Sequence, residues 1–213
     1  MIGLVLASAS PARLTTLRAA GVRPTVAVSA VDEPAVLAQA AAAGDVRPED
    51  AVLLLARAKA RDVAPAHPDT LVLGCDSMLE LDGEVLGKPT GADDAVARWR
   101  AMRGRTARLH SGHWLVDGRS GGPLTSGASE VGATSTTVVH FADVTDAEIA
   151  AYVATGEPLH VAGAFTIDGL GGPFVTGIEG DHHGVVGLSL PLLRTLLGQL
   201  DVTFPDLWAA PSA

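Results

Sequence analysis

The chain has little positive charge and a single cysteine. Its 213 residues carry 15 Lys and Arg against 24 Asp and Glu, a formal net charge of −9. Such a surface repels polyanions at long range, which argues against nucleic acid or an anionic membrane as the main partner but leaves room for a small anion bound with a metal ion. Cys75 alone excludes an intramolecular disulfide and indicates a reducing compartment, so we expect a cytoplasmic protein.

Long hydrophobic runs are also missing. No segment approaches ~18 uninterrupted apolar residues, and the first apolar run is short, starts at residue 2 and lacks a basic leader. The sequence therefore predicts neither a membrane span nor a signal peptide. No convincing repeat or domain linker is present, and 47% hydrophobic residues are ample for a sizeable core. We expect one domain over residues 1–213, with two lobes around a central cleft.

Several familiar motifs are absent. The seven histidines include no HExxH pattern and no His/Cys cluster, which argues against a histidine metal site. The glycines at 169, 171 and 172 match neither a Walker A loop nor a dinucleotide fingerprint, and we interpret them as loop hinges. Cys75 lies in an apolar strand, where a thiol behaves as a small hydrophobic group with a raised pKa rather than as a nucleophile.

Segments typical of strands alternate with segments typical of helices. Asp82-Gly83 predicts a type I′ hairpin, Thr145 and Glu148 have the spacing of a capping box, and Thr90 is the expected cap of the helix that follows it. The pattern predicts a mixed α/β sheet with flanking helices. The expected strands are 1–7, 25–29, 71–76, 77–81, 84–87, 106–116 and 135–141; the expected helices are 11–20, 48–64, 92–102, 145–156 and one from 191; the expected loops are 117–132 and an alanine-rich mobile rim at 33–45.

The segment LASASPAR, residues 6–13, passes from an apolar strand into a helix. Ser10 has the character of an N-cap and Pro11 that of a first helical residue, and Gly21 would end the helix. The first turn of a helix presents unpaired N–H groups, and Arg13 adds a full positive charge there. The segment therefore predicts an anion site; the alternative is an ordinary capped helix with a solvated arginine.

Residues 71–89 hold the most informative charges. Asp76 ends an apolar strand, where a carboxylate needs a metal, a cation or water to offset its desolvation. A two-residue turn would place Ser77 opposite Lys88 in the hairpin. Asp76 and Lys88 would then face opposite sides of the sheet, unless a bulge at Gly87 brings them together. The alternative is a structural Asp–Lys pair that closes the hairpin.

Two further groups gain meaning only beside a phosphate or a metal. Asp32 and Glu33 follow an extended segment and offer the oxygen ligands that a hard divalent cation needs, although on their own they indicate a solvated loop. Lys59 lies on an apolar helix, where a lysine by default extends its ammonium to solvent.

Together, these residues resemble the Maf-like nucleoside triphosphate pyrophosphatases. The resemblance covers nearly the whole chain, which makes coincidence improbable. It also implies a twisted central sheet with a cleft. The blocks that carry it are LASASPAR (6–13), VDE (31–33), LARAKA (55–60), GCDS (74–77), LGKP (86–89), AGAF (162–165), IEG (178–180) and VGL (186–188).

The resemblance implies an activity and a site. The family hydrolyses a nucleoside triphosphate between the α and β phosphates with Mg²⁺ or Mn²⁺, giving a monophosphate and pyrophosphate, and a homodimer is expected. By analogy Asp76 activates or positions the attacking water, and Glu33 helps Asp76 to hold the metal. The implied phosphate-binding residues are Ser8, Ser10, Arg13, Lys59 and Lys88.

Departures from the family pattern leave the preferred base open. Ala12 replaces the first arginine of a common pair, so one contact is missing or supplied by Arg18. Ser77 stands where threonine is frequent and keeps the hydroxyl. Asp168 stands at a position where one branch of the family, resembling enzymes for dTTP and UTP, has glutamine. Another branch, resembling enzymes for 7-methyl-GTP, has glutamate there. An acidic side chain accepts hydrogen bonds from donor groups of a base, which weighs against thymine and uracil.

Two other functions compete with the pyrophosphatase. A non-catalytic nucleotide sensor that regulates division or growth would fit the missing arginine and the family's association with septum formation. An α/β phosphatase acting on monophosphate esters would release orthophosphate instead of pyrophosphate.

Overall fold

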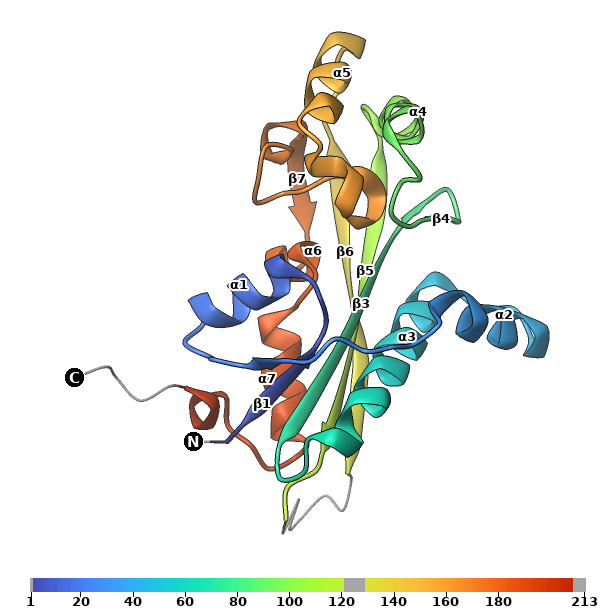
Figure 1. Ribbon diagram of the computed structural model, residues 1–213. Helices are drawn as coiled ribbons and strands as arrows, with labels where there is room; N and C mark the ends of the chain where they lie inside the picture. Colours follow the sequence, from blue (N-terminus) through green and yellow to red (C-terminus); the bar gives the residue numbers. More distant parts are fainter. Residues whose placement is uncertain (1, 121–128, 209–213) are drawn as a thin grey trace.

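The computed structural model describes residues 2–120 and 129–208, and a seven-stranded mixed sheet runs through them (Figure 1). The strand order is β2-β1-β3-β5-β6-β7, with β4 paired to β3. The pairs β1–β2 and β1–β3 are parallel and the others are antiparallel, so the predicted mixed sheet is confirmed. The strands are β1 (Leu4–Ala7), β2 (Thr25–Val26), β3 (Leu71–Leu81), β4 (Glu84–Leu86), β5 (Thr106–Asp117), β6 (Glu130–Phe141) and β7 (Val175–Glu179).

Helices cover the sheet in two groups (Figure 1). In the lower half of the view, α3 lies along one face, with α2 beside it, and α1 and α7 lie on the other face. In the upper half, α4 and α5 flank the ends of β3, β5 and β6 next to β7. The helices are α1 (Pro11–Ala19), α2 (Glu33–Ala43), α3 (Pro48–Val63), α4 (Ala92–Met102), α5 (Asp146–Ala154), α6 (His182–Val186) and α7 (Leu190–Gly198).

Each half has its own hydrophobic core, and the long strands pass through both. The upper core surrounds Trp99, whose ring meets three aromatic rings edge to face. The lower core between α1, α7 and the sheet contains Leu6, Leu17 and Leu193, all fully buried. Because hydrophobic side chains pack separately within the upper half and within the lower half, the junction between the halves is available for a site.

Local sequence signals give the structures that they predict. The Ser10 hydroxyl caps α1 by accepting from the Arg13 N–H, and Pro11 is the first helical residue. Asp82 and Gly83 both have positive φ, 55° and 84°, as a type I′ turn requires. The capping box of α5 forms between Thr145 and Glu148 as well.

The pairing expected at the hairpin is wrong in one respect. The β3–β4 ladder ends at Leu79–Leu86, so Ser77 does not pair with Lys88; on the other edge of β3, Ser77 pairs with Ser111 of β5. No bulge is needed at Gly87, because the chain leaves the sheet there: the Gly87 carbonyl accepts from Gly163 N at 3.1 Å and from the side chain of Arg98 at 2.6 Å.

Three features of the N-terminal half also differ from the predictions. The strand expected at 25–29 is only Thr25–Val26. Asp32 and Glu33 begin α2 instead of a loop, since the Asp32 carboxylate caps the helix by accepting from Ala35 N at 3.0 Å, and most of the expected rim is this helix. The cap of α4 is Gly91, while Thr90 donates to the Asp94 carboxylate.

The other differences concern the C-terminal half. β6 begins within the loop predicted at 117–132, because its first residues extend the antiparallel ladder with β5; residues 121–128 of that loop lie outside the described residues. β7 and α6 were not predicted, since the glycine-rich sequence around them masks their periodicity.

A close contact between α3 and the sheet yields the first testable prediction. A Cβ added at Gly74 would overlap the backbone oxygen of Ala56, whereas Gly198 has nothing within 4 Å. Gly74→Ala must therefore push α3 outward, and we expect the free energy of unfolding in urea to fall by about 1–3 kcal/mol. Gly198→Ala is the matched control; equal stability of the two variants would contradict the tight packing.

Candidate active site

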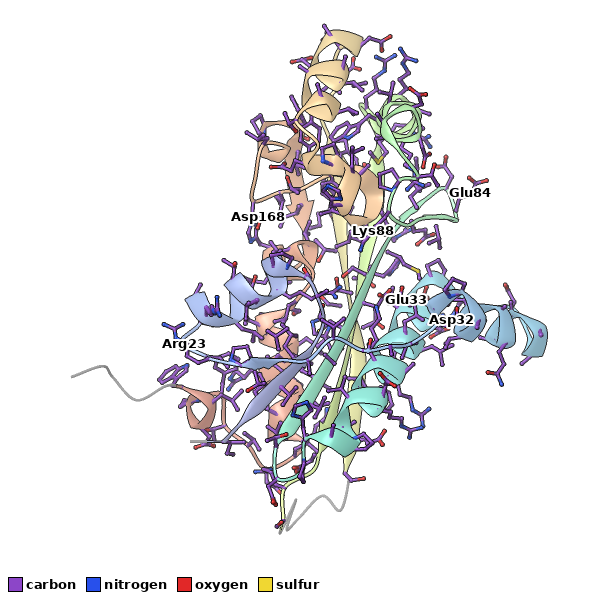
Figure 2. All side chains as sticks on the ribbon, viewed as in Figure 1. Arg23, Asp32, Glu33, Glu84, Lys88 and Asp168 are labelled. Carbon is purple, nitrogen blue, oxygen red and sulfur yellow. The ribbon has the colours of Figure 1, made fainter. Side chains whose placement is uncertain are left out.

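A cleft of about 770 Å³ lies at the junction of the two halves. Its walls come from the start of α1, residues 28–33, the middle of β3 with α3 behind it, the chain after β4, Leu109 of β5, residues 160–168 and the end of α6. Figure 2 shows Glu33 and Lys88 on one side of this region and Asp168 on another. Every site residue expected from the sequence lines the cleft: Ser8, Ser10, Ala12, Arg13, Glu33, Lys59, Asp76, Ser77, Lys88 and Asp168.

Asp76 lies inside β3 and not at its end, which corrects the prediction. The parallel ladder with β1 stops at Ala7–Gly74, while β3 continues to Leu81 against β5. Asp76 thus follows the last β1 pair after one intervening residue, Cys75, at the point where β3 loses its neighbour β1 and the cleft begins. Only 8% of Asp76 is exposed, so its carboxylate is largely removed from water.

Lys59 bridges two carboxylates instead of reaching solvent. Its ammonium lies 2.7 Å from Asp76 Oδ1 and 2.7 Å from Glu33 Oε1. The side chains of Lys59 and Asp76 are only 10% and 11% exposed, whereas that of Glu33 is 47% exposed. The default expectation for Lys59 was therefore wrong, because periodicity places a lysine on a helix but does not reveal a carboxylate on the strand beneath it.

Burial dominates the protonation of Asp76. Desolvation raises the pKa of this carboxyl above the ordinary value of 3.8, and the nearby charge of Glu33 adds to the rise. The positive charges of Lys59 and Arg13 act in the opposite direction without cancelling it. A carboxylate with a raised pKa is a stronger base than an exposed aspartate, which suits a group that accepts a proton.

The donor set is compatible with a divalent metal ion bound together with a phosphate. Asp76 and Glu33 already converge on one cation, the Lys59 ammonium, from two separate elements. Mg²⁺ commonly uses one or two protein carboxylates and completes its shell with water and substrate phosphates. In residues 2–120 and 129–208, no group of three or more His, Cys, Asp or Glu could hold a metal by itself, so a phosphate would have to supply ligands.

Arg13 is buried and bound to the protein. Its guanidinium links the loop before α1 to β3 and to the segment after α6, and the side chain holds these three parts together. The acceptors are Gly187 O (2.9 Å, from Nε), Ser8 Oγ (3.0 Å) and Cys75 O (2.9 Å, both from one terminal nitrogen), and Ser77 Oγ (3.0 Å, from the other).

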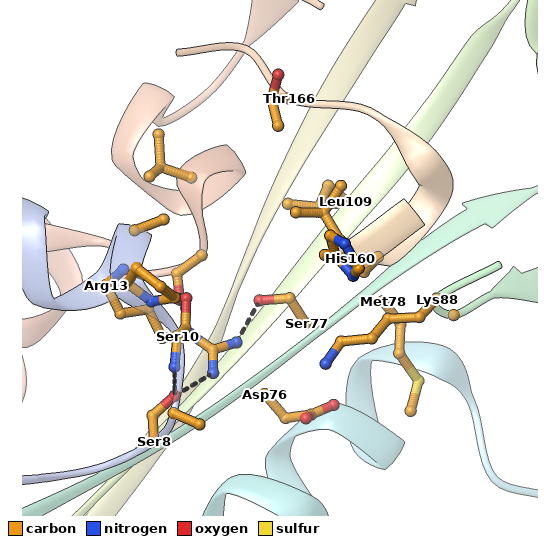
Figure 3. Close-up of a pocket in the computed structure, with 18 of the residues that line it drawn as sticks. Ser8, Ser10, Arg13, Asp76, Ser77, Met78, Lys88, Leu109, His160 and Thr166 are labelled. Atoms are coloured by element: carbon orange, nitrogen blue, oxygen red, sulfur yellow. Dashed lines mark hydrogen bonds between the residues drawn. The ribbon is translucent and has the colours of Figure 1, made fainter. Parts of the chain in front are cut away.

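These contacts fix the direction of two hydroxyl groups in the cleft. Ser8 Oγ accepts from Ser10 N at 3.2 Å and from Arg13, so its own proton is left for a ligand. Ser111 Oγ donates its only proton to Gly184 O at 2.8 Å, and Ser77 must therefore donate to Ser111. Ser8 presents a donor to the cleft and Ser77 presents an acceptor (Figure 3).

Lys88 and Asp168 are exposed to the cleft from opposite sides. Figure 3 shows the Lys88 ammonium directed toward Asp76. Within the described ranges, neither Lys88 nor Asp168 has an ion-pair partner, so both charges are available to a ligand. Arg18 lies in the last turn of α1 and does not line the cleft, and therefore does not replace the arginine missing at Ala12.

Some lining residues were missed by the sequence analysis. His160, Phe165, Thr166 and Ile167 form the upper wall together with Asp168. The AGAF block ending at Phe165 could have indicated this wall; Ser111, buried in β5, gave no signal. The expectation for Cys75 is confirmed, since burial raises the pKa of its thiol to about 11.

The fold and the site define the class of protein, and the match to a family model defines the family. A mixed α/β fold in which one buried acid, one exposed acid, lysines and a helix N-terminus converge on one cleft defines an α/β protein with an anion-binding site. Residues 3–200 match the family described as Maf-like protein. The chain belongs to this family.

Relatives from bacteria carry a functional name. A protein of Leifsonia xyli named nucleoside triphosphate pyrophosphatase is 57% identical over 210 residues, 96% of each chain. One of Streptomyces coelicolor with the same name is 55% identical over 97% of this chain and 94% of its own. Among solved structures, the Staphylococcus aureus Ham1 protein matches 66% of this chain and 72% of its own at 16% identity, with a TM-score of 0.37, which is too low to support an argument.

Proposed function

We propose that the protein hydrolyses the anhydride bond between the α and β phosphates of a nucleoside triphosphate, giving a nucleoside monophosphate and pyrophosphate. The observation that carries this proposal is the meeting of three cations, a helix N-terminus and two acids, one of them buried, in one cleft. The names of relatives 55% and 57% identical to this chain support it.

Asp76 is the proposed general base. In the reaction, a water oxygen bonds to the α phosphorus, the α–β bridging bond breaks, and the bridging oxygen leaves with pyrophosphate. Asp76 accepts the proton of the water, a role consistent with its raised pKa and its place in the cleft. Lys59 holds this carboxylate and that of Glu33 in position.

The phosphates are bound by donors of the lower half and by Lys88. Ser8 donates its free proton to a phosphate oxygen, and the first turn of α1 offers the Ala12 N–H. Pro11 has no N–H, and that of Arg13 donates to the Ser10 hydroxyl. Lys88 places a full positive charge near the negative charge that develops on the phosphate oxygens during the reaction. Arg13 acts through its charge and by orienting Ser8, since four of its five N–H groups donate to the protein.

Mg²⁺ or Mn²⁺ is the proposed cofactor, held by Asp76, Glu33 and the phosphates of the substrate. When bound, such a cation neutralises phosphate charge and lowers the pKa of a coordinated water. We keep Ala12, Ser77 and Asp168 as the proposed specificity residues. Asp168 would accept from a donor group of the base and Ser77 from a donor of the substrate.

Lys88→Ala tests phosphate binding. The ammonium is directed into the cleft, and no residue that the structure describes forms an ion pair with it, so its loss should weaken binding of a triphosphate about tenfold or more and that of the monophosphate of the same base by less. Isothermal titration calorimetry of both nucleotides measures the ratio. Arg108→Ala, which removes an exposed cation outside this cleft, is the control; an unchanged ratio in Lys88→Ala would contradict the assignment.

A second candidate is a non-catalytic nucleotide-binding regulator of cell division. The observation in its favour is the alanine at position 12, which Arg18 does not replace. Tight nucleotide binding without pyrophosphate release would select this function.

The homodimer and the cytoplasmic location stay predictions. Light scattering after gel filtration measures the first, and fractionation of cells measures the second. None of the described helices is both long and apolar enough to pass through a membrane.

A further inference from the structure

The upper wall of the cleft differs chemically from the lower one. Residues that attract phosphate lie on the lower half and at Lys88, whereas the upper wall is built of Phe165, Thr166, Ile167 and Asp168. A largely apolar surface with a few polar groups suits a nucleobase better than a phosphate. On the proposed function, the base would therefore contact the segment that contains residues 165–168.

This segment continues into a glycine-rich loop, and the loop is fastened to one carboxylate. Glu157 lies in the turn after α5, and three side-chain or backbone groups donate to its Oε1, while a fourth donates to Oε2. These donors are Thr166 Oγ1 (2.5 Å), Tyr152 OH (3.1 Å) and Gly171 N (3.1 Å) for Oε1, and Leu170 N (3.1 Å) for Oε2.

The glycines of the loop are explained by the same carboxylate. A Cβ added at Gly169 would lie 2.6 Å from Glu157 Oε2, and one added at Gly171 would lie 2.6 Å from the Tyr152 hydroxyl. Only a chain without side chains at these positions can wrap around the acid. Gly169 and Gly171, expected from the sequence to be loop hinges, therefore allow the loop to pack closely around Glu157.

Glu157 is ionised and balanced by hydrogen bonds alone. Burial by itself would raise the pKa of its carboxyl, but the hydrogen bonds from these four donors lower it below the usual range. In the part of the chain that the structure describes, no lysine or arginine pairs with it. Glu157 does not line the cleft either, so it can act on a ligand only through the loop that it holds.

We propose that Glu157 is a positioning residue for base recognition: it fixes the loop of residues 166–171 and thereby sets where Thr166, Ile167 and Asp168 meet the nucleobase. This inference rests on the proposed function, which supplies the nucleotide. It assigns base discrimination and phosphate binding to separate parts of the protein, because the phosphate contacts lie on other elements.

Glu157→Gln tests the proposal. Glutamine has the same shape, but its amide group brings donors to a position that now accepts four donors. Two nucleoside triphosphates are compared: the best substrate of the unmodified protein and one with a tenfold lower kcat/KM. In Glu157→Gln we expect this tenfold ratio to fall to about threefold or less. The inhibition constant of pyrophosphate, which lacks a base, should change less than twofold.

Matched variants separate this role from general destabilisation. Glu148→Gln makes the same change at a capping carboxylate of α5 that does not touch the loop, and it should keep base discrimination. Tyr152→Phe removes one donor to Glu157 and an acceptor for Thr166 N, and it should shift discrimination in the same direction by a smaller factor. It also serves if Glu157→Gln does not fold.

The outcomes are distinct. Unchanged discrimination in both Glu157→Gln and Tyr152→Phe, or a proportional loss for all triphosphates and for pyrophosphate, would overturn the inference. Affinities of the nucleoside monophosphates are measured in parallel. If the unmodified protein bound nucleotides without turnover, the proposed function would fail, and discrimination among the monophosphates would still decide the role of Glu157.

Discussion

Asp76→Asn is expected to lower kcat by about 10²–10⁴-fold, the range typical for loss of a general base. The asparagine amide has the size of the carboxylate but cannot accept the proton of the attacking water. Nucleotide affinity should change far less, because Ser8, Lys88 and the first turn of α1 are untouched. Steady-state kinetics with a nucleoside triphosphate and a divalent cation measure the effect.

The fold should survive this substitution. Lys59 keeps Glu33 as its partner, and the amide removes a buried charge. Asp93→Asn, at an exposed position in the first turn of α4, is the matched control and should leave kcat unchanged. Turnover at the unmodified level in a folded Asp76→Asn protein would show that the acid is structural.

The pH dependence of the reaction follows from the raised pKa of Asp76. Protonated Asp76 cannot accept a proton, so kcat/KM should fall on the acidic side, with a midpoint above the 3.8 of an ordinary aspartate. The residual activity of Asp76→Asn should lack this acidic limb. If the acidic limb had the same midpoint in the unmodified protein and in Asp76→Asn, the limb would belong to a group other than Asp76.

Lys59→Met should have the largest effect on stability. It removes the cation between Asp76 and Glu33 and leaves the buried Asp76 carboxylate without its ion-pair partner. Breaking a buried pair from one side costs about 3–5 kcal/mol, and we expect a loss of this size in the free energy of unfolding at pH 7. Urea denaturation followed by circular dichroism measures it.

The sign of the pH effect on this variant is fixed. A buried acid whose pKa is raised in the folded state binds its proton more tightly there than in the unfolded chain, so folding gains as the pH falls through that pKa. Without Lys59 the pKa of Asp76 rises further, because a group that lowers it is lost. The loss of stability should therefore shrink from pH 7 to pH 5.

A double variant supplies the control. In Lys59→Met/Asp76→Asn the unpaired charge is gone, and most of the lost stability should return. A Lys59→Met protein as stable as the unmodified one at pH 7 would contradict the buried ion pair. So would a loss of stability that does not depend on pH.

Features that depend on neighbours in the sequence could be predicted from it. The cap of α1 at Ser10, the turn at Asp82-Gly83 and the box at Thr145 are each decided within four residues, and all three form as expected. The end of the β3–β4 ladder could not be predicted in this way. It depends on Gly163, about eighty residues away, which takes the Gly87 carbonyl.

The site was predicted by residue, but not by geometry. The motif resemblance selected residues that line one cleft, yet it did not show that Lys59 sits between two acids or that four of the five N–H groups of Arg13 donate to the protein. Those facts follow from the crossing of α3 over β3 and from the loop after α6. Glu157 escaped notice for the same reason, since its partners belong to a loop without periodicity.

The central claim is that this cleft cleaves a nucleoside triphosphate between the α and β phosphates. Phosphorus NMR of the purified protein with a panel of ordinary and methylated nucleoside triphosphates and Mg²⁺ or Mn²⁺ tests it directly. The account predicts nucleoside monophosphate and pyrophosphate in equal amounts from at least one of them. Orthophosphate as the first product, or no turnover of any triphosphate, would contradict it.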